Sequence, residues 1–330
     1  MFQIPSLGMG CAGIGNLYRA ISETDARAAV EAAWTAGIRL FDTAPFYGFG
    51  LSETRLGAAL DALDPAQSAI ISTKVGRLLE PIETSQNERH GFVQGLSFEP
   101  VFDYSRDAVL RSHEASLKRL KRERVNILLA HDIGRLTHKD RAEAHMRDFL
   151  DGGYPAMLEL KAQGRIDAIG VGVNEIEVCT FLLERIDLDL ILLAGRYTLL
   201  DRSAADTVFP LCLGKGVRVL AGGPYNSGIL AMPLNRQINP HYDYASPPAG
   251  IMDRARAIER TCNSVGVDLP TAALQFPARH PAVASVIAGM ASASEVDESL
   301  ERFQAHVPPN LWDRLAVEQG SGQLGEGQAK

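Results

Sequence analysis

Strand-like and helix-like segments alternate along almost the whole chain, and this alternation restricts the possible folds more than any other feature. Short β-branched or Leu-rich runs bounded by polar residues and glycine are typical of buried parallel strands. Eight such runs occur, at Leu7–Gly10, Leu40–Thr43, Ala69–Lys74, Val125–Ala130, Ala168–Val173, Leu188–Ala194, Val217–Ala221 and Ala284–Ala288. Most of the intervals between them carry apolar residues at helical spacing.

The interval between the first two runs illustrates the helical pattern. Ser22 and Asp25 resemble a capping box at its start, and Gly37 is a typical helix stop. Six further helices are predicted at Ser52–Leu63, Ser105–Leu120, Tyr154–Gln163, Ile176–Glu184, Ala204–Leu213 and Ile251–Val265. Eight βα units in 330 residues, without a linker or a shift in composition, predict an α/β protein with one closed (β/α)8 TIM barrel over residues 1–317.

Two long segments interrupt this rhythm. Leu79–Tyr104 follows the third predicted strand, and Pro233–Gly250 follows the seventh. Loops of this length in a compact domain commonly form lids or binding walls, so we expect both to lie over the carboxyl-terminal mouth of the barrel. The polar, Gly-rich segment 318–330 is predicted to be a flexible tail.

Composition argues against several classes of protein. The formal net charge of −7 is unfavourable for an extended nucleic-acid surface. The four cysteines are far apart and form no CxxC pair, which favours buried, reduced thiols over disulfides or a zinc site, and no metal site is predicted. No apolar run approaches the roughly 20 residues of a membrane span, and no signal-like segment begins the chain. We therefore expect a cytoplasmic protein that acts on a small molecule.

Reactive side chains close three consecutive predicted strands. Asp42, Lys74 and His131 stand at or next to the ends of the second, third and fourth strands, and Tyr47 follows Asp42 on the same loop. The carboxyl ends of parallel strands converge at one mouth, so these four side chains are expected to meet. Each alone is more often a cap, a packing residue or an ion-pair partner. Their coincidence at neighbouring strand ends favours a proton-transfer site.

These residues resemble the catalytic tetrad of the aldo-keto reductase superfamily, and the resemblance runs over nearly the whole chain. The matching positions are Asp42–Gly48, Ser52, Glu53, Leu56, Gly57, Ser72–Lys74, His131, Asp132, Gly170–Gly172, Asn174, Ile287 and Gly289. Two segments, Leu192–Arg202 and Gly222–Leu230, are similar to the bacterial branch that includes D-threo-aldose (L-fucose, L-galactose) 1-dehydrogenases and pyridoxal 4-dehydrogenases.

The resemblance implies hydride transfer with Tyr47 as the acid/base. A phenol with a pKa near 10 is a weak base at neutral pH, and an adjacent Lys74 ammonium would lower the pKa of Tyr47. Asp42 would hold Lys74 charged, and His131 would orient the substrate oxygen. Oxidation of an aldose at C1 to the lactone is the favoured reaction. The alternatives are pyridoxal oxidation, a slow-turnover nicotinamide-binding regulatory subunit, and a Schiff-base aldolase that uses Lys74.

The resemblance also implies a nicotinamide cofactor around the rim of the barrel. Asn174 would bind the carboxamide, the Asn226-Ser227-Gly228 loop would contact the pyrophosphate, and Gly289 and Ser292 would bind the adenosine phosphate. Three positions depart from the family pattern, where Ser, Gln and an aromatic residue are usual: Val173, Ala194 and Gly222.

NAD is expected in preference to NADP. Relatives that prefer NADP often place cations just after the eighth strand, whereas here no cation of that segment precedes Arg302. Glu295 occupies the usual arginine position and would repel a 2′-phosphate, and Glu298 could accept hydrogen bonds from the adenine amino group. Alternatively, Glu295 is only a first-turn acid favoured by the helix dipole.

A sugar or pyridoxal-like substrate would need apolar faces and hydrogen-bonding groups. The residues expected to contact it are Phe46, Phe49, Arg196, Tyr197 and Tyr244. The alternative is that these aromatic residues only pack the lid.

Overall fold

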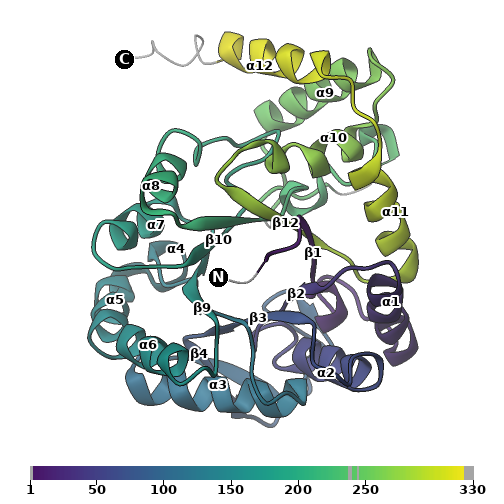
Figure 1. Ribbon diagram of the computed structural model, residues 1–330. Helices are drawn as coiled ribbons and strands as arrows, with labels where there is room; N and C mark the ends of the chain where they lie inside the picture. The colour runs from purple at the N-terminus through teal and green to yellow at the C-terminus, as the bar shows by residue number, and fades with distance from the viewer. Residues whose placement is uncertain (1–2, 237–239, 244, 323–330) are drawn as a thin grey trace.

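The computed structural model describes residues 3–236, 240–243 and 245–322, and it confirms the predicted (β/α)8 barrel (Figure 1). Eight parallel strands close in the order β1-β12-β11-β10-β9-β8-β3-β2. Their bounds are β1 Leu7–Gly10, β2 Leu40–Asp42, β3 Ile70–Val75, β8 Ile127–His131, β9 Ala168–Val173, β10 Leu190–Ala194, β11 Arg218–Gly222 and β12 Val283–Gly289. Each of the eight predicted strands corresponds to one of these within two residues.

Helices surround the barrel, and all seven predicted ones are present. The helices are α1 Glu23–Thr35, α2 Leu51–Leu63, α3 Arg106–Leu120, α4 Arg135–His138, α5 Ala142–Asp148, α6 Tyr154–Ala162, α7 Ile176–Leu183, α8 Val208–Lys215, α9 Ala249–Asn263, α10 Leu269–Gln275, α11 Ala293–Gln304 and α12 Asn310–Gly322. Helix α8 begins at Val208 rather than Ala204, and α12 continues past Glu318 into the segment predicted as a tail. Residues 323–330 lie outside the described residues.

The predicted capping box at the start of α1 is confirmed. The backbone N–H of Asp25 donates to Ser22 Oγ at 3.0 Å, and Ser22 Oγ donates to the Asp25 carboxylate at 2.8 Å. These bonds satisfy groups that the first turn of a helix otherwise leaves unpaired. Helix α1 therefore begins where the local sequence directs it.

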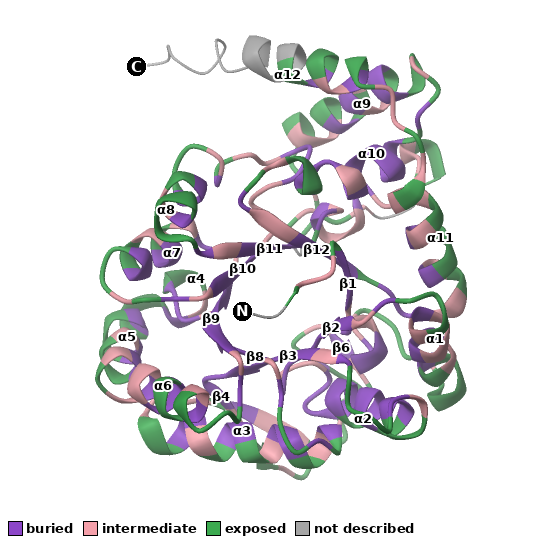
Figure 2. Cartoon of the chain, in the orientation of Figure 1, coloured by how far each residue is buried: buried purple, intermediate pink, exposed green. Residues whose placement is uncertain are grey.

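Buried residues lie along the barrel strands and on the helices that surround them (Figure 2). Eight apolar residues fill its interior: Leu40, Ile127, Leu129, Ala168, Leu190, Leu192, Leu220 and Ile287. A larger core packs the outer face of the strands against the inward faces of the helices. A separate cluster joins α9, α10 and α12 beside the barrel. Because the interior is filled, the mouth at the carboxyl ends of the strands is closed from below.

The segment predicted as a loop at Leu79–Tyr104 is mostly a β-ribbon. Strands β4 (Arg77–Pro81) and β7 (Phe98–Phe102) pair antiparallel, and so do β5 (Glu88–Arg89) and β6 (Phe92–Val93). The guanidinium of Arg89 donates to the carbonyls of Phe98 and Leu96 at 2.7 and 2.6 Å and ties the two pairs together. We call residues 77–102 the ribbon segment.

The long loop after β11, which contains His241, contacts the loop after β1, which contains Tyr18, across the mouth of the barrel. Tyr18 stacks on His241 with ring centroids 5.7 Å apart and an interplanar angle of 18°. The backbone N–H of Tyr18 also donates to Gly91 of the ribbon segment at 2.9 Å. Three loops from distant parts of the sequence are thus joined above the barrel. Residues 237–239 and 244 lie outside the described residues.

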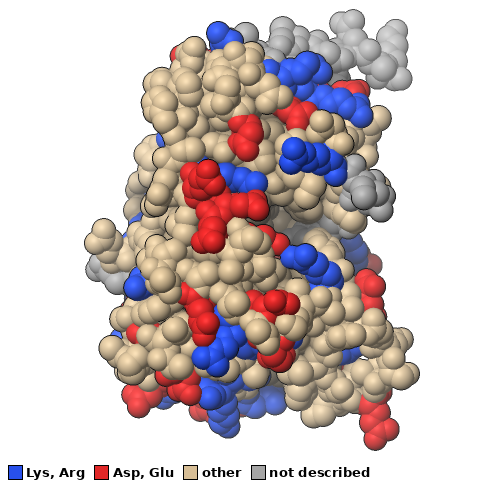
Figure 3. All heavy atoms as spheres, turned by 90° about the vertical axis from the view of Figure 1, so that its right-hand side faces the viewer, with Lys and Arg blue, Asp and Glu red and all other residues tan. Residues whose placement is uncertain are grey.

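Other expectations from composition concern the surface and the cysteines. On the face drawn in Figure 3, acidic and basic side chains are interspersed, without a continuous basic stripe. All four cysteines are buried and free, as predicted. Within the described residues, no helix has the length and apolar character that crossing a bilayer requires.

Glu53, at the start of α2, connects three elements from a fully buried position. Its side chain has 0% exposure. Thr73 Oγ1 of β3 donates to Oε1 at 2.6 Å, and Arg119 Nε of α3 donates to Oε2 at 2.6 Å. Burying a carboxylate is costly unless it is paired and hydrogen-bonded, and here both oxygens are bonded. The contacts hold α2, and with it the loop that precedes it, against the barrel.

We expect Glu53→Ala to lower the free energy of unfolding by about 3 kcal/mol or more, because the partners Thr73 and Arg119 remain without their acceptor. Urea denaturation measures this change. The control is Glu31→Ala, which removes an exposed i,i+4 pair with Arg27 and should change stability by about 0.5 kcal/mol or less. Equal effects of the two substitutions would contradict the role assigned to Glu53.

Candidate active site

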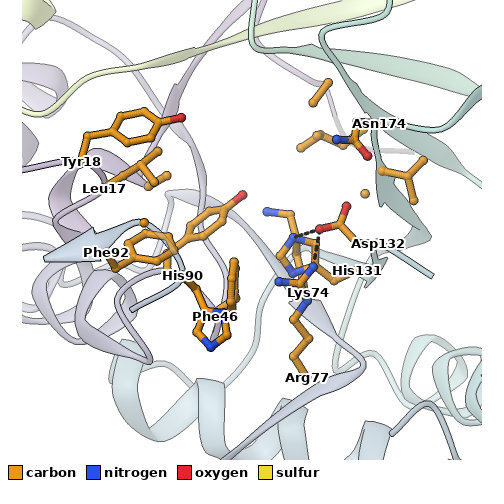
Figure 4. A pocket seen from close by; sticks show the side chains of 17 residues that line it. Leu17, Tyr18, Phe46, Lys74, Arg77, His90, Phe92, His131, Asp132 and Asn174 are labelled. Carbon is orange, nitrogen blue, oxygen red and sulfur yellow. Dashed lines mark hydrogen bonds and ion pairs between the residues drawn. The ribbon is translucent and has the colours of Figure 1, made fainter. Parts of the chain in front are cut away.

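Four predicted residues come together at the carboxyl-terminal mouth of the barrel. Asp42, Lys74 and His131 lie at the ends of β2, β3 and β8, which are neighbours in the barrel, and Tyr47 lies on the loop between β2 and α2. Lys74, Tyr47 and His131 line a cavity of about 480 Å³ (Figure 4). Asp42 lies behind Lys74. The geometry therefore confirms that these side chains meet.

Lys74 is buried and held by oxygen atoms. Its Nζ donates to Asp42 Oδ2 and to the Thr43 carbonyl, both at 2.8 Å, and Ser72 Oγ donates to Asp42 Oδ1 at 2.8 Å. Burial alone lowers the pKa of Lys74, but the Asp42 carboxylate and the hydrogen bonds outweigh it, so the pKa is raised above its usual value. The side chain is therefore a fixed ammonium.

Tyr47 is placed beside this ammonium by a tightly packed loop. Lys74 Nζ lies 4.7 Å from the centre of the Tyr47 ring, and the Tyr47 and His131 ring centroids are 6.0 Å apart. Gly48, next to Tyr47, has φ 63°, and a Cβ there would lie 2.3 Å from the carbonyl oxygen of Gly15. Only glycine allows both this backbone conformation and this approach. The turn at Gly15 thus fixes the backbone that carries Tyr47.

His131 is neutral at neutral pH. Burial, with further contributions from the nearby Arg77 and Lys74 cations, lowers its pKa well below the usual value. Its backbone carbonyl accepts a hydrogen bond from Tyr104 at 2.6 Å, and Tyr104 Oη lies 2.9 Å from His138 Nε2. A neutral imidazole offers one donor and one acceptor nitrogen, which suits hydrogen bonding to a carbonyl or hydroxyl oxygen.

The cavity has an aromatic side and a polar side (Figure 4). The aromatic side, which we call the aromatic wall, consists of Tyr18, Phe46 and Phe92. The polar side contains Arg77 and Asp132 next to His131. The residues that line the cavity but were not assigned to the site from the sequence are Ala12, Leu17, Tyr18, Arg77, His90, Gly91, Phe92, Asp132, Gly172 and Leu192. Asp132 could have been assigned to the cavity from the sequence, since it belongs to the His131-Asp132 motif. No sequence pattern indicated Arg77.

The residues predicted to contact the substrate differ in their position relative to the cavity. Phe46 lines the cavity, whereas Phe49 is fully buried behind it, with ring centroids 6.2 Å apart. Arg196 donates from Nε to the Asn174 carbonyl at 2.8 Å and pairs with Asp201 and Asp243, so among the described residues it supports the rim rather than lining the cavity.

Tyr197, also predicted to contact the substrate, packs away from this cavity. Its ring packs against Phe209, Phe276 and His280, with centroids 4.8, 5.0 and 5.5 Å apart, and it is not among the lining residues. The chain turns after β10 so that this ring is partly buried between the barrel and the neighbouring helices. Tyr244, the fifth predicted substrate residue, lies outside the described residues.

The predicted nicotinamide residues are only partly available for a ligand. Asn174 lines the cavity, as does Ala194. In the turn after β11, the Asn226 and Gly228 N–H groups donate to the Gly223 and Tyr225 carbonyls at 3.0 Å each. The side-chain amide of Asn226 is also engaged, because it donates to Gly195 and accepts from Thr198. The backbone donors of Asn226 and Gly228, which were expected to contact the pyrophosphate, are therefore used within the protein.

The two glycines expected next to the cofactor phosphates nevertheless border open space. A Cβ built at Gly228 or Gly289 meets no atom of the described residues within 4 Å. At Gly222, where the family usually has an aromatic residue, a Cβ would lie 3.1 Å from Leu192 Cδ2. Leu192 lines the cavity and occupies part of the space that such a ring would need. These residues fit the cofactor, with an aliphatic side chain where a stacking ring is usual.

At the start of α11, Glu295 serves as part of a capping box. The Ala291 N–H donates to Glu295 Oε2 at 2.7 Å, and the Glu295 N–H donates to Ser292 Oγ at 3.2 Å. Glu295 Oε1 accepts from Arg19 Nη2 at 2.7 Å. The structure thus supports the first-turn role of Glu295 and adds a cation, Arg19, that the local sequence after β12 could not reveal. Glu298 pairs with Arg302 at 2.8 Å on the same helix.

Comparisons with known proteins agree with this geometry. The model of the Aldo/keto reductase family matches residues 6–316. The chain is 41% identical over 325 residues to pyridoxal 4-dehydrogenase of Microbacterium luteolum, with 96% of this chain and 94% of that protein covered. It is 37% identical over 318 residues to D-threo-aldose 1-dehydrogenase of Pseudomonas sp, with 95% and 93% covered.

A solved structure supports the same assignment. The holo form of aldo-keto reductase AKR11C1 from Bacillus halodurans superposes with a TM-score of 0.74 at 25% identity, covering 94% of this chain and 91% of that one. The family match spans the barrel strands and the four residues that meet at the mouth. The chain therefore belongs to the aldo/keto reductase family of nicotinamide-dependent oxidoreductases.

Proposed function

We propose that the protein oxidises an aldose at C1 to the lactone, with NAD as the cofactor. The observation that carries the proposal is the fixed Lys74 ammonium, 4.7 Å from the centre of the Tyr47 ring, at one end of a cavity that also contains the neutral His131. One similar protein is named for aldose 1-dehydrogenation, which supports this substrate class.

In this proposal the protein residues accept the proton of the reaction and orient the substrate. Lys74, held by Asp42, stabilises the phenolate form of Tyr47, which accepts the proton of the C1 hydroxyl. The neutral His131 hydrogen-bonds the same oxygen and orients the C1–H bond. Asn174 would hold the carboxamide of the nicotinamide, which supplies the hydride acceptor when bound. In the direction of carbonyl reduction, Tyr47 returns the proton.

Pyridoxal is the second candidate substrate. The relative with 41% identity is named pyridoxal 4-dehydrogenase. The rings of Phe46 and Phe92, 5.4 Å apart, also offer flat apolar surface for an aromatic substrate. The aldolase alternative is disfavoured, because a Schiff base requires a neutral amine and the pKa of Lys74 is raised.

A substrate screen with one variant tests the proposal. Wild-type protein should oxidise at least one of L-fucose, L-galactose, D-arabinose or pyridoxal with a nicotinamide cofactor. Tyr47→Phe should lower kcat by about 10² to 10⁴, because it removes the proton acceptor, while cofactor affinity measured by fluorescence titration stays unchanged. Activity confined to hydrophobic aldehydes, or a variant retaining more than about a tenth of wild-type kcat, would contradict the proposal.

The pH dependence of kcat follows from the shifted pKa values. The pKa of His131 is lowered below 6.5 and that of Lys74 is raised above 10.5, so neither group titrates between these values. We expect an acid limb within this window to report Tyr47. Lys74→Met should shift it upward by about 1 to 3 pH units, because it removes the positive charge next to the phenol.

The control for this shift is Lys161→Met, which removes a partly exposed pair with Asp189 outside the mouth. It should leave the pH profile of kcat in place. An acid limb that Lys74→Met leaves unchanged would show that Lys74 does not set the protonation of the reacting group.

NAD should be used about tenfold or more efficiently than NADP, because the only described cation at the start of α11, Arg19, is already paired with Glu295. Glu295→Gln keeps the capping box but releases Arg19, and Glu295→Arg adds a further cation. Both variants should raise kcat/KM for NADP relative to NAD. Equal or better efficiency with NADP in the wild type would refute this preference.

A further inference from the structure

Asp132 occupies a special position directly after His131. Its φ of 42° places it in the left-handed region, which Asp and Asn tolerate better than most residues. Its backbone N–H donates to the Gly172 carbonyl at 2.9 Å. This bond holds the turn that follows β8 against the neighbouring strand β9. The side chain is 25% exposed and lines the cavity. A carboxyl group is thus presented at the mouth by a rigid backbone.

Arg77 holds this carboxyl group from one side. Its Nη2 donates to Asp132 Oδ2. The guanidinium carbon lies 4.0 Å from the centre of the Phe46 ring and 5.4 Å from that of Phe102, and the side chain is only 6% exposed. Cation–π contacts of this kind restrict the guanidinium. Arg77 therefore orients Asp132 but is itself largely covered.

The second oxygen of Asp132 faces the cavity. Figure 4 shows one oxygen directed to Arg77 and His131 and the other directed into the open space below Asn174. Within the described part of the chain, no group donates a hydrogen bond to Oδ1. The Oδ2 atom lies 3.4 Å from His131 Nε2, so the acceptor is next to the histidine assigned to the substrate oxygen. A substrate bound at His131 would have its neighbouring carbon close to Oδ1.

We propose that Asp132, positioned by Arg77, accepts a hydrogen bond from a substrate hydroxyl next to the reacting carbon and so selects neutral hydroxylated substrates. The inference deepens the proposed function and rests on it for the site at which the substrate binds. An ionised carboxyl group is an acceptor only, so it pairs with hydroxyl groups. A site built to hydrogen-bond a hydroxyl rejects the analogue that lacks it, because its own polar group is left unpaired.

The same carboxylate disfavours anionic substrates. Like charges repel strongly where water is partly excluded, and Arg77, although it lines the cavity, is already paired with Asp132 and lies against the Phe46 ring. The substrate class is therefore a neutral hydroxyaldehyde or its hemiacetal, and aldose phosphates and uronic acids are disfavoured. Aldoses belong to the accepted class.

The variant that tests this inference is Asp132→Asn. It retains the shape and tolerates the positive φ. Because Arg77 would take the amide oxygen, the NH2 group would face the cavity, and an acceptor becomes a donor. The matched control is Asp167→Asn, which removes a carboxylate paired with Arg124 at the opposite end of the barrel. The effect of the substitution is measured as the reduction of three-carbon aldehydes by NADH. This assay does not depend on which larger substrate the protein oxidises.

Wild-type protein should prefer glyceraldehyde to propanal. Asp132→Asn should lower kcat/KM for glyceraldehyde by about 10- to 100-fold and leave propanal almost unchanged, so the preference disappears. Turnover of glyceraldehyde 3-phosphate should rise in the variant, because the repelling charge is gone. Asp167→Asn should behave as the wild type.

An equal loss with glyceraldehyde and propanal would mean that Asp132 only supports His131, and it would overturn the inference. A wild-type protein without preference between the two aldehydes would overturn it as well. If the preference depends on Asp132 but no aldose or pyridoxal is oxidised, the inference stands and the proposed function fails. The two proposals are therefore distinguishable.

Discussion

The ammonium of Lys74 is almost completely removed from water, with 1% exposure, and oxygen atoms of the neighbouring strand replace its hydration. Removing such an ion from water costs several kcal/mol, which only well-placed partners offset. The placement comes from the register of the barrel. Asp42 pairs with Ser72, and Lys74 lies two residues further along β3, so its side chain is on the same face as that of Ser72. The charge at the mouth is therefore a consequence of strand pairing.

Because strand pairing determines where the Lys74 charge lies, the centre of the site could be predicted from the sequence. Buried parallel strands have a strong apolar pattern, and a polar residue that ends such a strand has a nearly determined position. Asp42, Lys74 and His131 each follow that rule. Tyr47 lies on a short, glycine-constrained loop after β2, so it too was close to a predicted strand end. The barrel strands and the larger helices were predictable for the same reason.

Contacts between distant segments were not predictable. Arg77 and Asp132 are 55 residues apart, and Arg19 and Glu295 are 276 apart, so no local pattern joins either pair. The sequence around Glu295 showed a carboxylate but not the cation that neutralises it. The packing of Tyr197 was not predictable either, because an aromatic residue just after a strand can turn into the core or into the mouth. Only the packing of Phe209 and Phe276 decides between them.

The ribbon segment gives the cavity a wall that is separate from the barrel. Its tip contributes His90, Gly91 and Phe92 to the cavity, whereas the tetrad is carried by the barrel strands and the β2 loop. The ribbon leaves the barrel after β3 and returns before α3, and its strands pair with each other rather than with the barrel. Changes at the tip can therefore accumulate during evolution without altering the four residues proposed to transfer the proton. In such an architecture, new substrate preferences can arise by variation in one excursion of the chain while the reaction chemistry is inherited intact.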